Sequence, residues 1–374
     1  MVRSDIVLVL ALTAHFGFAR HCQNLTIPVT ISAQNSGWNI SPPSNNVEVI
    51  NWVLDVNRQG HTYAQDVFGG YTTVSGTYNI GTTYCSPDHG HGKKIQILTH
   101  GGGFDRTYWD LPYNNFNYSY LNAAVDEYGF STLTWDRIGV GESDHPDPLR
   151  DVQAPLSEQA LKLITELIHN GTFPGIEHEF EKVHHVGHSI GSALTLSLIR
   201  DYPAISDAAV LTGFSANGTW ADYFMLGSNW LSTTEIPRFS KDYSAGYIAW
   251  DHPSGIQTAF LAPGEFDPEA LIWAANNTSP TSPGEVLQVG FPERNNFTGP
   301  LLVITGERDL VFCGGDCYKT GDPQVPSLLN YTYLIAPDAR PLKNIVVPRG
   351  GHGLNMEYGH KQTYADINKF LLEH

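Results

Sequence analysis

The sequence predicts an α/β architecture: a mostly parallel central sheet with helices on both faces and an inserted cap. Two observations predict it. Short apolar runs alternate with helix-patterned segments through much of the chain after residue 94. One stretch, 214–298, breaks this alternation and is rich in Trp, Tyr, Phe, Gly and Pro. A segment of that length is too long for a plain loop in a compact domain, so we expect it to form a cap over the sheet.

The elements follow in order along the chain. Residues 35–46 are rich in Asn, Ser, Gly and Pro and predict an exposed arm. Residues 47–56 and 71–84 are rich in β-branched and aromatic side chains and predict antiparallel strands. Buried strands are expected at 95–99, 130–135, 183–186, 208–212, 301–305 and 344–347, and helices at 156–169, 189–200 and 364–372. The expected division is a leader at 1–20, a core at 21–213 and 299–374, and the cap at 214–298.

Composition narrows the possible partners. The chain has 374 residues, 41% of them hydrophobic, which is enough for a large core. Its formal net charge of −17 repels phosphate backbones, so we expect no nucleic-acid partner. A small-molecule substrate is the expected ligand, and the sequence carries no signal for a particular oligomeric state.

The first twenty residues resemble a secretory signal peptide. Arg3 precedes an apolar run at 6–19, and the small residues Gly17 and Ala19 suit a signal peptidase. The run is too short for a membrane span, so no stable membrane anchor is expected. A buried N-terminal strand or helix is the alternative reading of this run.

Glycosylation sequons support secretion and an extracellular location independently. Nine Asn-x-Ser/Thr tripeptides suggest a glycosylated surface. They begin at Asn24, Asn39, Asn117, Asn170, Asn217, Asn276, Asn277, Asn296 and Asn330. Adjacent Asn276 and Asn277 are expected to carry one glycan at most.

Four cysteines, an even number, suit an oxidising compartment. Cys313 and Cys317 enclose two glycines and an aspartate, a loop that can bend to join the two sulfurs. The remaining pair would be Cys22–Cys85. A metal site at Cys313 and Cys317 is the weaker reading, because no further ligands lie nearby in the sequence. We expect no metal and no cofactor.

The sequence Gly187-His188-Ser189-Ile190-Gly191 follows a predicted strand and opens a predicted helix. A nucleophilic serine needs this sharp turn, and glycines two positions before and after it let helix and strand approach closely. The helix N-terminus favours negative charge that develops beside the serine. Ser189 is therefore the candidate nucleophile; the alternative is a glycine-rich turn with an incidental serine.

A second glycine-rich loop, His100-Gly101-Gly102-Gly103, follows the strand at 95–99. A tetrahedral intermediate needs two backbone N–H donors, an oxyanion hole. One donor is expected from Ile190, the residue after the nucleophile, and the other from Gly102 or, as second choice, Gly103. A purely structural turn is the alternative.

The candidate base is His352, in Gly350-Gly351-His352-Gly353 after the strand at 344–347. The acid that orients it should follow the preceding strand, where Asp309 is the first candidate and Glu307 and Asp316 are alternatives. The chain order Ser, Asp, His fits this assignment. We expect His184 and His185 to be structural, His188 to pack or hydrogen-bond behind the nucleophile, and His360 to be solvated.

These motifs resemble those of the α/β-hydrolase superfamily, in the branch with HG-rich oxyanion loops and GHSxG elbows. The turn Trp135-Asp136-Arg137-Ile138-Gly139-Val140-Gly141-Glu142-Ser143 is similar to the turn after the preceding strand in that branch. The resemblance spans His100 to the C-terminus; with the leader and the sequons, the whole chain resembles secreted fungal members of this superfamily. Dehalogenases and epoxide hydrolases of similar build carry a carboxylate at the elbow, so the serine at 189 argues against both.

The resemblance implies a serine hydrolase that cleaves a carboxylic ester or lactone through an acyl-enzyme. An apolar or aromatic substrate is expected to contact cap aromatics, although we expect most of them to form the core of the cap. They are Trp220, Tyr223, Phe224, Trp230, Tyr247 and Trp250. The alternatives are an acyltransferase, lyase or isomerase on the same scaffold, in secondary metabolism, and a binding protein without activity.

Overall fold

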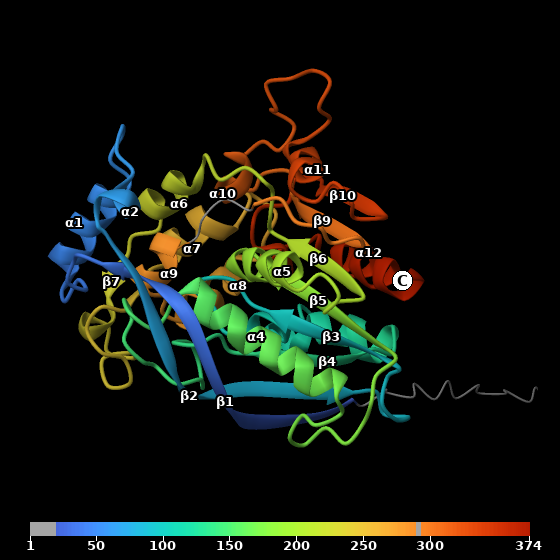
Figure 1. Ribbon diagram of the computed structural model, residues 1–374. Coiled ribbons are helices and arrows are strands. Elements are labelled where there is room, and N and C mark those ends of the chain that lie inside the picture. Colours follow the sequence, from blue (N-terminus) through green and yellow to red (C-terminus); the bar gives the residue numbers. More distant parts are fainter. Residues whose placement is uncertain (1–19, 289–292) are drawn as a thin grey trace, which may run out of the picture.

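The computed structural model describes residues 20–288 and 293–374. The predicted signal peptide therefore lies outside the described residues, except for its last residue, Arg20. The described chain is built around one large twisted sheet with the C-terminal helix behind it (Figure 1).

Within the described residues the sheet has eight strands in the order β1-β2-β4-β3-β5-β6-β9-β10. β1 pairs antiparallel with β2, and β2 with β4, whereas all the other neighbours run parallel. This confirms the predicted mostly parallel sheet. The strands are β1 (His21–Trp38), β2 (Phe68–Ser86), β3 (Lys94–Thr99), β4 (Ser131–Trp135), β5 (Lys182–His188), β6 (Ala208–Thr212), β9 (Leu301–Gly306) and β10 (Leu342–Val347).

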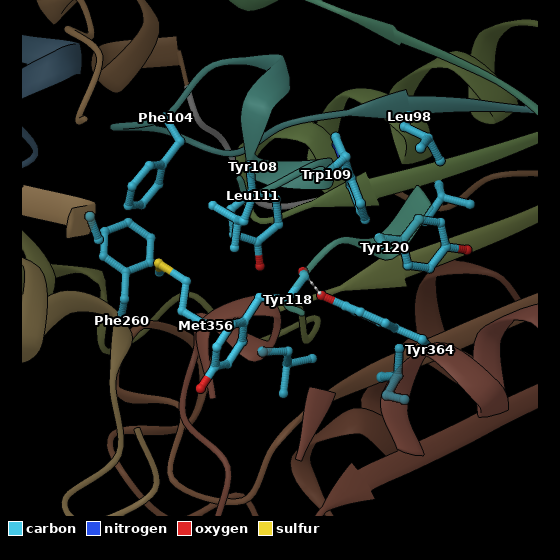
Figure 2. Packing of buried hydrophobic residues seen from close by; sticks show 14 of the residues in the cluster. Leu98, Phe104, Tyr108, Trp109, Leu111, Tyr118, Tyr120, Phe260, Met356 and Tyr364 are labelled. Atoms are coloured by element: carbon cyan, nitrogen blue, oxygen red, sulfur yellow. Dashed lines mark hydrogen bonds between the residues drawn. The ribbon is translucent and has the colours of Figure 1, made fainter. Parts of the chain in front are cut away.

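Helices cover both faces because alternate strand residues point to opposite sides. On β3, Ile97 belongs to the same buried cluster as Leu161 of α4 (Ala154–His169), whereas its neighbour Leu98 packs with the cluster of α12 (His360–Glu373). Figure 2 shows this second cluster, in which Tyr120 lies edge-on to Tyr364 of α12. α5 (Ile190–Asp201) packs beside α4, and η2 (Asn122–Glu127) beside α12.

The chain between β6 and β9 forms short helices and a two-stranded ribbon beyond the carboxyl ends of the parallel strands (Figure 1). We call residues 214–288 and 293–298 the cap segment. Its elements are α6 (Ala221–Gly227), β7 (Leu231–Ser232), η3 (Thr233–Glu235), β8 (Ile248–Ala249), α7 (Pro253–Phe260), α8 (Pro268–Asn276) and α9 (Pro283–Gln288).

Shorter elements complete the described chain. Two lie in the connection from β1 to β2, two follow β3, and four follow β9 or β10. They are α1 (Asn46–Val56), α2 (Tyr63–Asp66), η1 (Arg106–Trp109), α3 (Tyr113–Phe116), α10 (Leu310–Cys313), η4 (Leu328–Tyr331), α11 (Thr332–Ile335) and η5 (Leu354–Met356).

The N-terminal region corrects two expectations. Residues 47–56, predicted as a strand, form the helix α1, which Asn45 caps by accepting a hydrogen bond from the Glu48 N–H. Val49, Trp52 and Val53 face inward at helical spacing, and this burial outweighs the β-propensity of the segment. The predicted arm at 35–46 is not wholly exposed, because β1 continues to Trp38 and buries Asn35. The strand predicted at 71–84 lies within β2 as expected.

Both predicted disulfides are present, Cys22–Cys85 and Cys313–Cys317. Cys22 and Cys85 lie directly opposite each other in the β1–β2 pair. Cys313 and Cys317 close a tight loop after β9. The first bond therefore ties the sheet's antiparallel edge, and the second ties a loop at the carboxyl end of the sheet.

The asparagines of the nine sequons lie at or near the surface. Asn217 and Asn330 are half-buried, and the other seven are exposed. No helix among residues 20–288 and 293–374 is long and apolar enough to cross a membrane.

Candidate active site

Ser189 occupies a sharp turn between β5 and α5. Its backbone has φ 55° and ψ −117°, a conformation that costs energy for a residue with a side chain. A Cβ on Gly187 would lie 2.3 Å from the Gly191 carbonyl oxygen, and one on Gly191 would lie 2.3 Å from the Thr99 oxygen. The two glycines are therefore required for helix α5 to start this close to the strands, as the motif predicts.

The structure brings the three predicted residues Ser189, His352 and Asp309 into one hydrogen-bonded line. The His352 Nε2 atom lies 2.9 Å from Ser189 Oγ, and its Nδ1 atom lies 2.9 Å from Asp309 Oδ2. Ser189 is 9% exposed and His352 is 1% exposed. The imidazole can therefore take a proton from the hydroxyl on one side while the carboxylate holds its other nitrogen.

Asp309 is the carboxylate that reaches the imidazole. It also accepts hydrogen bonds from the Thr305 hydroxyl (2.6 Å) and the Phe312 N–H (3.0 Å). Burial alone would raise its pKa, but His352 and these donors hold the pKa of Asp309 below its ordinary value. It is therefore ionised at neutral pH.

The two alternative acids lie away from the imidazole's hydrogen bonds. Glu307 accepts a hydrogen bond from the Arg349 N–H (2.8 Å) in an exposed setting. Asp316 accepts one from the Tyr318 N–H within the disulfide loop.

The loop after β3 lies against the nucleophile. A Cβ on Gly101 would come within 3.0 Å of Ser189 Cβ, and one on Gly102 would meet the Ile190 side chain at 3.1 Å. The Ile190 N–H stands in the first turn of α5, where a helix leaves its N–H groups without intrahelical partners. Gly102 thus lies against the side chain of Ile190, the residue that follows the nucleophile.

Gly103, the second choice, has a different setting. Its φ is +77°, and the Trp250 ring lies where a side chain would project. Its carbonyl accepts the Ser279 N–H of the cap segment at 2.8 Å. Gly103 is thus the point at which the cap segment contacts the oxyanion loop.

Several histidines surround this line without joining it. As expected, His188 packs and hydrogen-bonds: it stacks on Tyr108 with ring centres 4.4 Å apart and lies 3.1 Å from the Thr212 hydroxyl. Its ring centre is 4.9 Å from that of His352. Burial lowers the pKa of His188 well below its ordinary value, so this imidazole is neutral. The expectation that His360 is solvated is wrong: it is buried, and its ring contacts the Asn117 carbonyl oxygen at 3.0 Å.

The cap aromatics divide into two groups. The rings of Trp230 and Trp250 pack with centres 4.0 Å apart and planes tilted by 31°, and Phe224 lies edge-on to both. Phe260 continues this group to the imidazole, with its ring centre 5.5 Å from that of His352. These side chains form the core of the cap segment next to the base. Tyr247 is also buried, but in another cluster, where its ring centre lies 5.2 Å from that of Tyr243.

Trp220 and Tyr223 lie farther out. Trp220 packs on Gly314 of the disulfide loop, and Tyr223 is 51% exposed. Beyond Trp220 lies a cavity of about 540 Å³ that Leu328 and Tyr331 also line. These two aromatics therefore border the disulfide loop rather than the nucleophile.

Several residues that support the site escaped the sequence reasoning. Thr305 bonds to Asp309, as described above. The Glu357 carboxylate accepts the N–H groups of Gly351 and Ala262, both at 2.7 Å, and so joins the loop of the base to the cap segment. Burial raises the pKa of Glu357 to about 7. No sequence motif marks either residue, because each acts through a contact that forms only in the folded chain.

The possible metal ligands are not clustered in the described part of the chain. That part contains no group of three or more His, Cys, Asp or Glu side chains that could hold a metal ion.

Comparisons with known proteins agree with this geometry. The model of the Alpha/beta hydrolase family matches residues 96–366. No curated protein sequence matches the chain. Among solved structures, a thermophilic esterase from Thermogutta terrifontis is similar at 17% identity and a TM-score of 0.52, with 80% of this chain and 94% of that one covered.

Structures with other names are similar to the same degree. A bromoperoxidase from Bacillus anthracis has 16% identity and a TM-score of 0.51, covering 79% of this chain and 96% of its own. A proline iminopeptidase from Mycobacterium smegmatis has 18% identity and a TM-score of 0.50, covering 79% and 95%. At such identities the likeness establishes the fold and leaves the reaction to the site.

Proposed function

This chain belongs to the alpha/beta hydrolase family, and we propose that it hydrolyses a carboxylic ester or lactone with Ser189 as the nucleophile. The observation that carries the proposal is the hydrogen-bonded line from Ser189 through His352 to Asp309. A serine hydroxyl is a weak nucleophile unless a base takes its proton, and this line supplies the base and the group that orients it.

The mechanism follows from the placement of these atoms. Ser189 Oγ attacks the ester carbonyl while His352 Nε2 takes its proton, and Asp309 stabilises the imidazolium that forms. The N–H groups of Gly102 and Ile190 stabilise the negative oxygen of the tetrahedral intermediate. The imidazolium then returns the proton to the leaving alcohol, and water releases the acyl group by the reverse sequence.

Apolar or aromatic substrates suit the surroundings of the base. Phe260 and Phe312 flank the His352 ring, with centres 5.5 and 5.8 Å away, and Trp250 covers Gly103. A substrate that reaches Ser189 must pass close to these rings, and rings of this kind stabilise apolar groups by burial. The similar structure named an esterase agrees with ester chemistry.

An acyltransferase is the second candidate, because the nucleophile is nearly closed off. Ser189 is 9% exposed, and the cap segment contacts the oxyanion loop through Trp250 and Ser279. A site that limits water can pass its acyl group to a bound alcohol. Product analysis in the presence of a competing alcohol separates the two: an ester product identifies transfer, and free acid alone identifies hydrolysis.

A covalent probe tests the nucleophile. We expect a fluorophosphonate to label the wild-type protein and to leave Ser189→Ala unlabelled. Ser192→Ala is the matched control, since Ser192 is a buried serine of the same helix whose hydroxyl donates to the Thr212 carbonyl (2.8 Å). Labelling that survives in Ser189→Ala, or is absent from the wild type, would overturn the proposal.

We also propose that the protein is secreted and glycosylated. The apolar run at 6–19 and the nine sequons support this, seven of them with exposed asparagines. Expression of the full chain in eukaryotic cells should place it in the medium without its leader, and glycosidase treatment should lower its mass. Full-length, unmodified protein that stays inside the cells would contradict this.

A further inference from the structure

The carbonyl of Gly101 is held by two donors that come from different parts of the chain. The His100 Nδ1 atom lies 2.8 Å from the Gly101 oxygen, and the Arg137 Nη2 donates to it at 3.2 Å. His100 Nε2 accepts the backbone N–H of Arg137 at 3.1 Å, which leaves the proton of the neutral ring on Nδ1. Burial and the charge of Arg137 lower the pKa of His100 well below its ordinary value, so the ring stays in this neutral form.

This carbonyl belongs to the peptide unit that carries the Gly102 N–H. In a trans peptide the C=O and the N–H point in opposite directions, so fixing one fixes the other. Glycines have no side chain to limit rotation, and without these two donors the Gly101–Gly102 peptide could turn. The direction of the proposed oxyanion donor is therefore set by His100 and Arg137.

Arg137 is itself fixed by the cap segment. Its guanidinium is fully buried and pairs with the Glu285 carboxylate of α9, which is 1% exposed. The other Glu285 oxygen accepts the Thr281 hydroxyl at 3.0 Å. α9 is in turn anchored to the core, where Gly284 donates its N–H to the Pro148 carbonyl oxygen at 3.2 Å.

We propose that Arg137 is a positioning residue for the oxyanion hole and that Glu285 of the cap segment holds it in place. The inference rests on the proposed function, because it assigns a role within the same hydrolytic site. It makes the oxyanion hole depend on a docked cap: one buried cation joins the α9 carboxylate to the peptide that presents the Gly102 N–H.

Charge explains why the pair has to stay together. A buried guanidinium without its carboxylate is left uncompensated in a medium of low dielectric constant, which is strongly unfavourable. Displacing α9 would remove that carboxylate and release the guanidinium from the Gly101 oxygen. A lysine at 137 could still pair with Glu285, but a single ammonium lacks the planar, several-armed geometry that bonds to both groups at once.

The test compares an ester with its matched thionoester, in which sulfur replaces the carbonyl oxygen. Sulfur is a poorer hydrogen-bond acceptor, so the thionoester gains less from the oxyanion hole. In Arg137→Lys we expect kcat for the ester to fall by at least about tenfold, towards the roughly 10²–10³-fold loss known for an oxyanion donor. KM should change little, and the thionoester rate should fall less, so the ester-to-thionoester ratio drops.

Glu285→Gln should lower the same ratio, because it removes the charge that holds Arg137. Should either variant fail to fold, Thr281→Val, which loses only the hydroxyl bonded to Glu285, should lower the ratio by a smaller factor. The matched control is Glu235→Gln, also a cap carboxylate, which bonds to Asn46 on the surface and should leave the ratio unchanged.

Urea unfolding of each variant reports stability separately from the ratio. The inference is overturned if the ester-to-thionoester ratio stays at its wild-type value in all three variants, which includes the case in which both rates fall by the same factor. Ser189→Ala distinguishes this from failure of the proposed function. If Ser189→Ala still hydrolyses both substrates, the proposed function is wrong. If Ser189→Ala is inactive but the ratio is unchanged in the variants of Arg137, Glu285 and Thr281, only the role of Arg137 is wrong.

Discussion

His352 contacts its two partners through one atom pair each, Nε2 with Ser189 Oγ and Nδ1 with Asp309 Oδ2. The proton of the Ser189 hydroxyl therefore passes to one acceptor in this line, the His352 Nε2 atom. The other buried histidine beside it, His188, lies 3.1 Å from the hydroxyl of Thr212 and is held neutral by burial. Because that contact is with Thr212 and not with Ser189 or Asp309, His188 does not take the place of His352 in this line.

The first prediction at this scale is non-additivity. Ser189→Ala and His352→Ala should each lower kcat by about 10⁴-fold or more, and the double variant should lose little beyond that, because the two act as a unit. Steady-state rates of all three on one ester measure this. Losses that multiply in the double variant would show that the residues act independently.

The second prediction concerns the acid. Asp309→Asn should lower kcat by about 10³- to 10⁴-fold, because an amide neither fixes the imidazole tautomer nor stabilises imidazolium. Glu307→Gln is the matched control two residues away, and it should change kcat less than about threefold, since the Glu307 carboxylate accepts the exposed Arg349 N–H and not the imidazole. The opposite ranking would assign the acid to Glu307.

Among the elements, α10 and its disulfide loop determine the position of the acid. The Gly315 N–H donates to the Asp309 carbonyl at 2.9 Å, and the Cys317 N–H donates to the Glu307 carbonyl at 2.9 Å. The Cys313–Cys317 bond closes the loop that makes both contacts. Loss of this disulfide should therefore change the position of Asp309.

The third prediction contrasts the two disulfides. Replacing Cys313 and Cys317 by serine should lower kcat clearly, because triad geometry tolerates little displacement. With a sequence separation of 4, the bond should contribute only about 2 kcal/mol to stability by loop entropy. Replacing Cys22 and Cys85, with a separation of 63, should cost about 4 kcal/mol and leave kcat of the folded protein nearly unchanged. Urea unfolding and kcat of both variants test this contrast. A large loss of stability without loss of kcat in the Cys313/Cys317 variant, and the opposite in the Cys22/Cys85 variant, would contradict it.

The elements also show how far sequence reasoning reaches. The turn at Ser189 and the strand ends at Asp309 and His352 could be predicted because each depends on residues next to it in the chain. Helix α1 could not, because its β-branched residues favour a strand and only burial of Trp52 decides otherwise. The Arg137–Glu285 pair joins residues 148 positions apart, and nothing local to either one indicates it.

For the molecule as a whole, several contacts between the cap segment and the core lie around one site. Trp250 and Ser279 contact Gly103, Glu285 pairs with Arg137, and Glu357 bonds to the Ala262 N–H. These contacts reach the oxyanion loop and the loop of the base. The arrangement explains why Ser189 is nearly closed off, and it implies that substrate entry must loosen at least part of this joint.

The whole molecule should also lose stability as the pH rises above about 6.5, and Glu158 of α4 is the clearest cause. Its side chain is buried, and burial together with the charge of Asp201 raises the pKa of Glu158 to about 8. Between about pH 4.5 and 8 the folded protein keeps a proton that the unfolded chain releases. On its own, this group makes stability fall as pH rises through this window. The lowered pKa values of Asp309 and of buried histidines such as His184 and His185 act in the opposite direction, but only below about pH 6.5, so the net fall is expected above it.

Glu158→Gln removes this titration while keeping the size of the side chain. We expect the variant to match the wild type within about 1 kcal/mol at pH 5 and to exceed its unfolding free energy by roughly 4 kcal/mol at pH 8, since the pKa is raised from 4.5 to about 8 and each unit corresponds to about 1.4 kcal/mol. Glu166→Gln on the same helix, with a side chain 43% exposed, is the matched control and should leave the shape of the pH curve unchanged. Urea unfolding at both pH values measures the difference. If the difference in unfolding free energy between Glu158→Gln and the wild type were the same at pH 8 as at pH 5, the proton on Glu158 would have no part in the pH dependence. Any loss above pH 6.5 would then have to come from other buried carboxyls such as Glu357, whose pKa burial also raises.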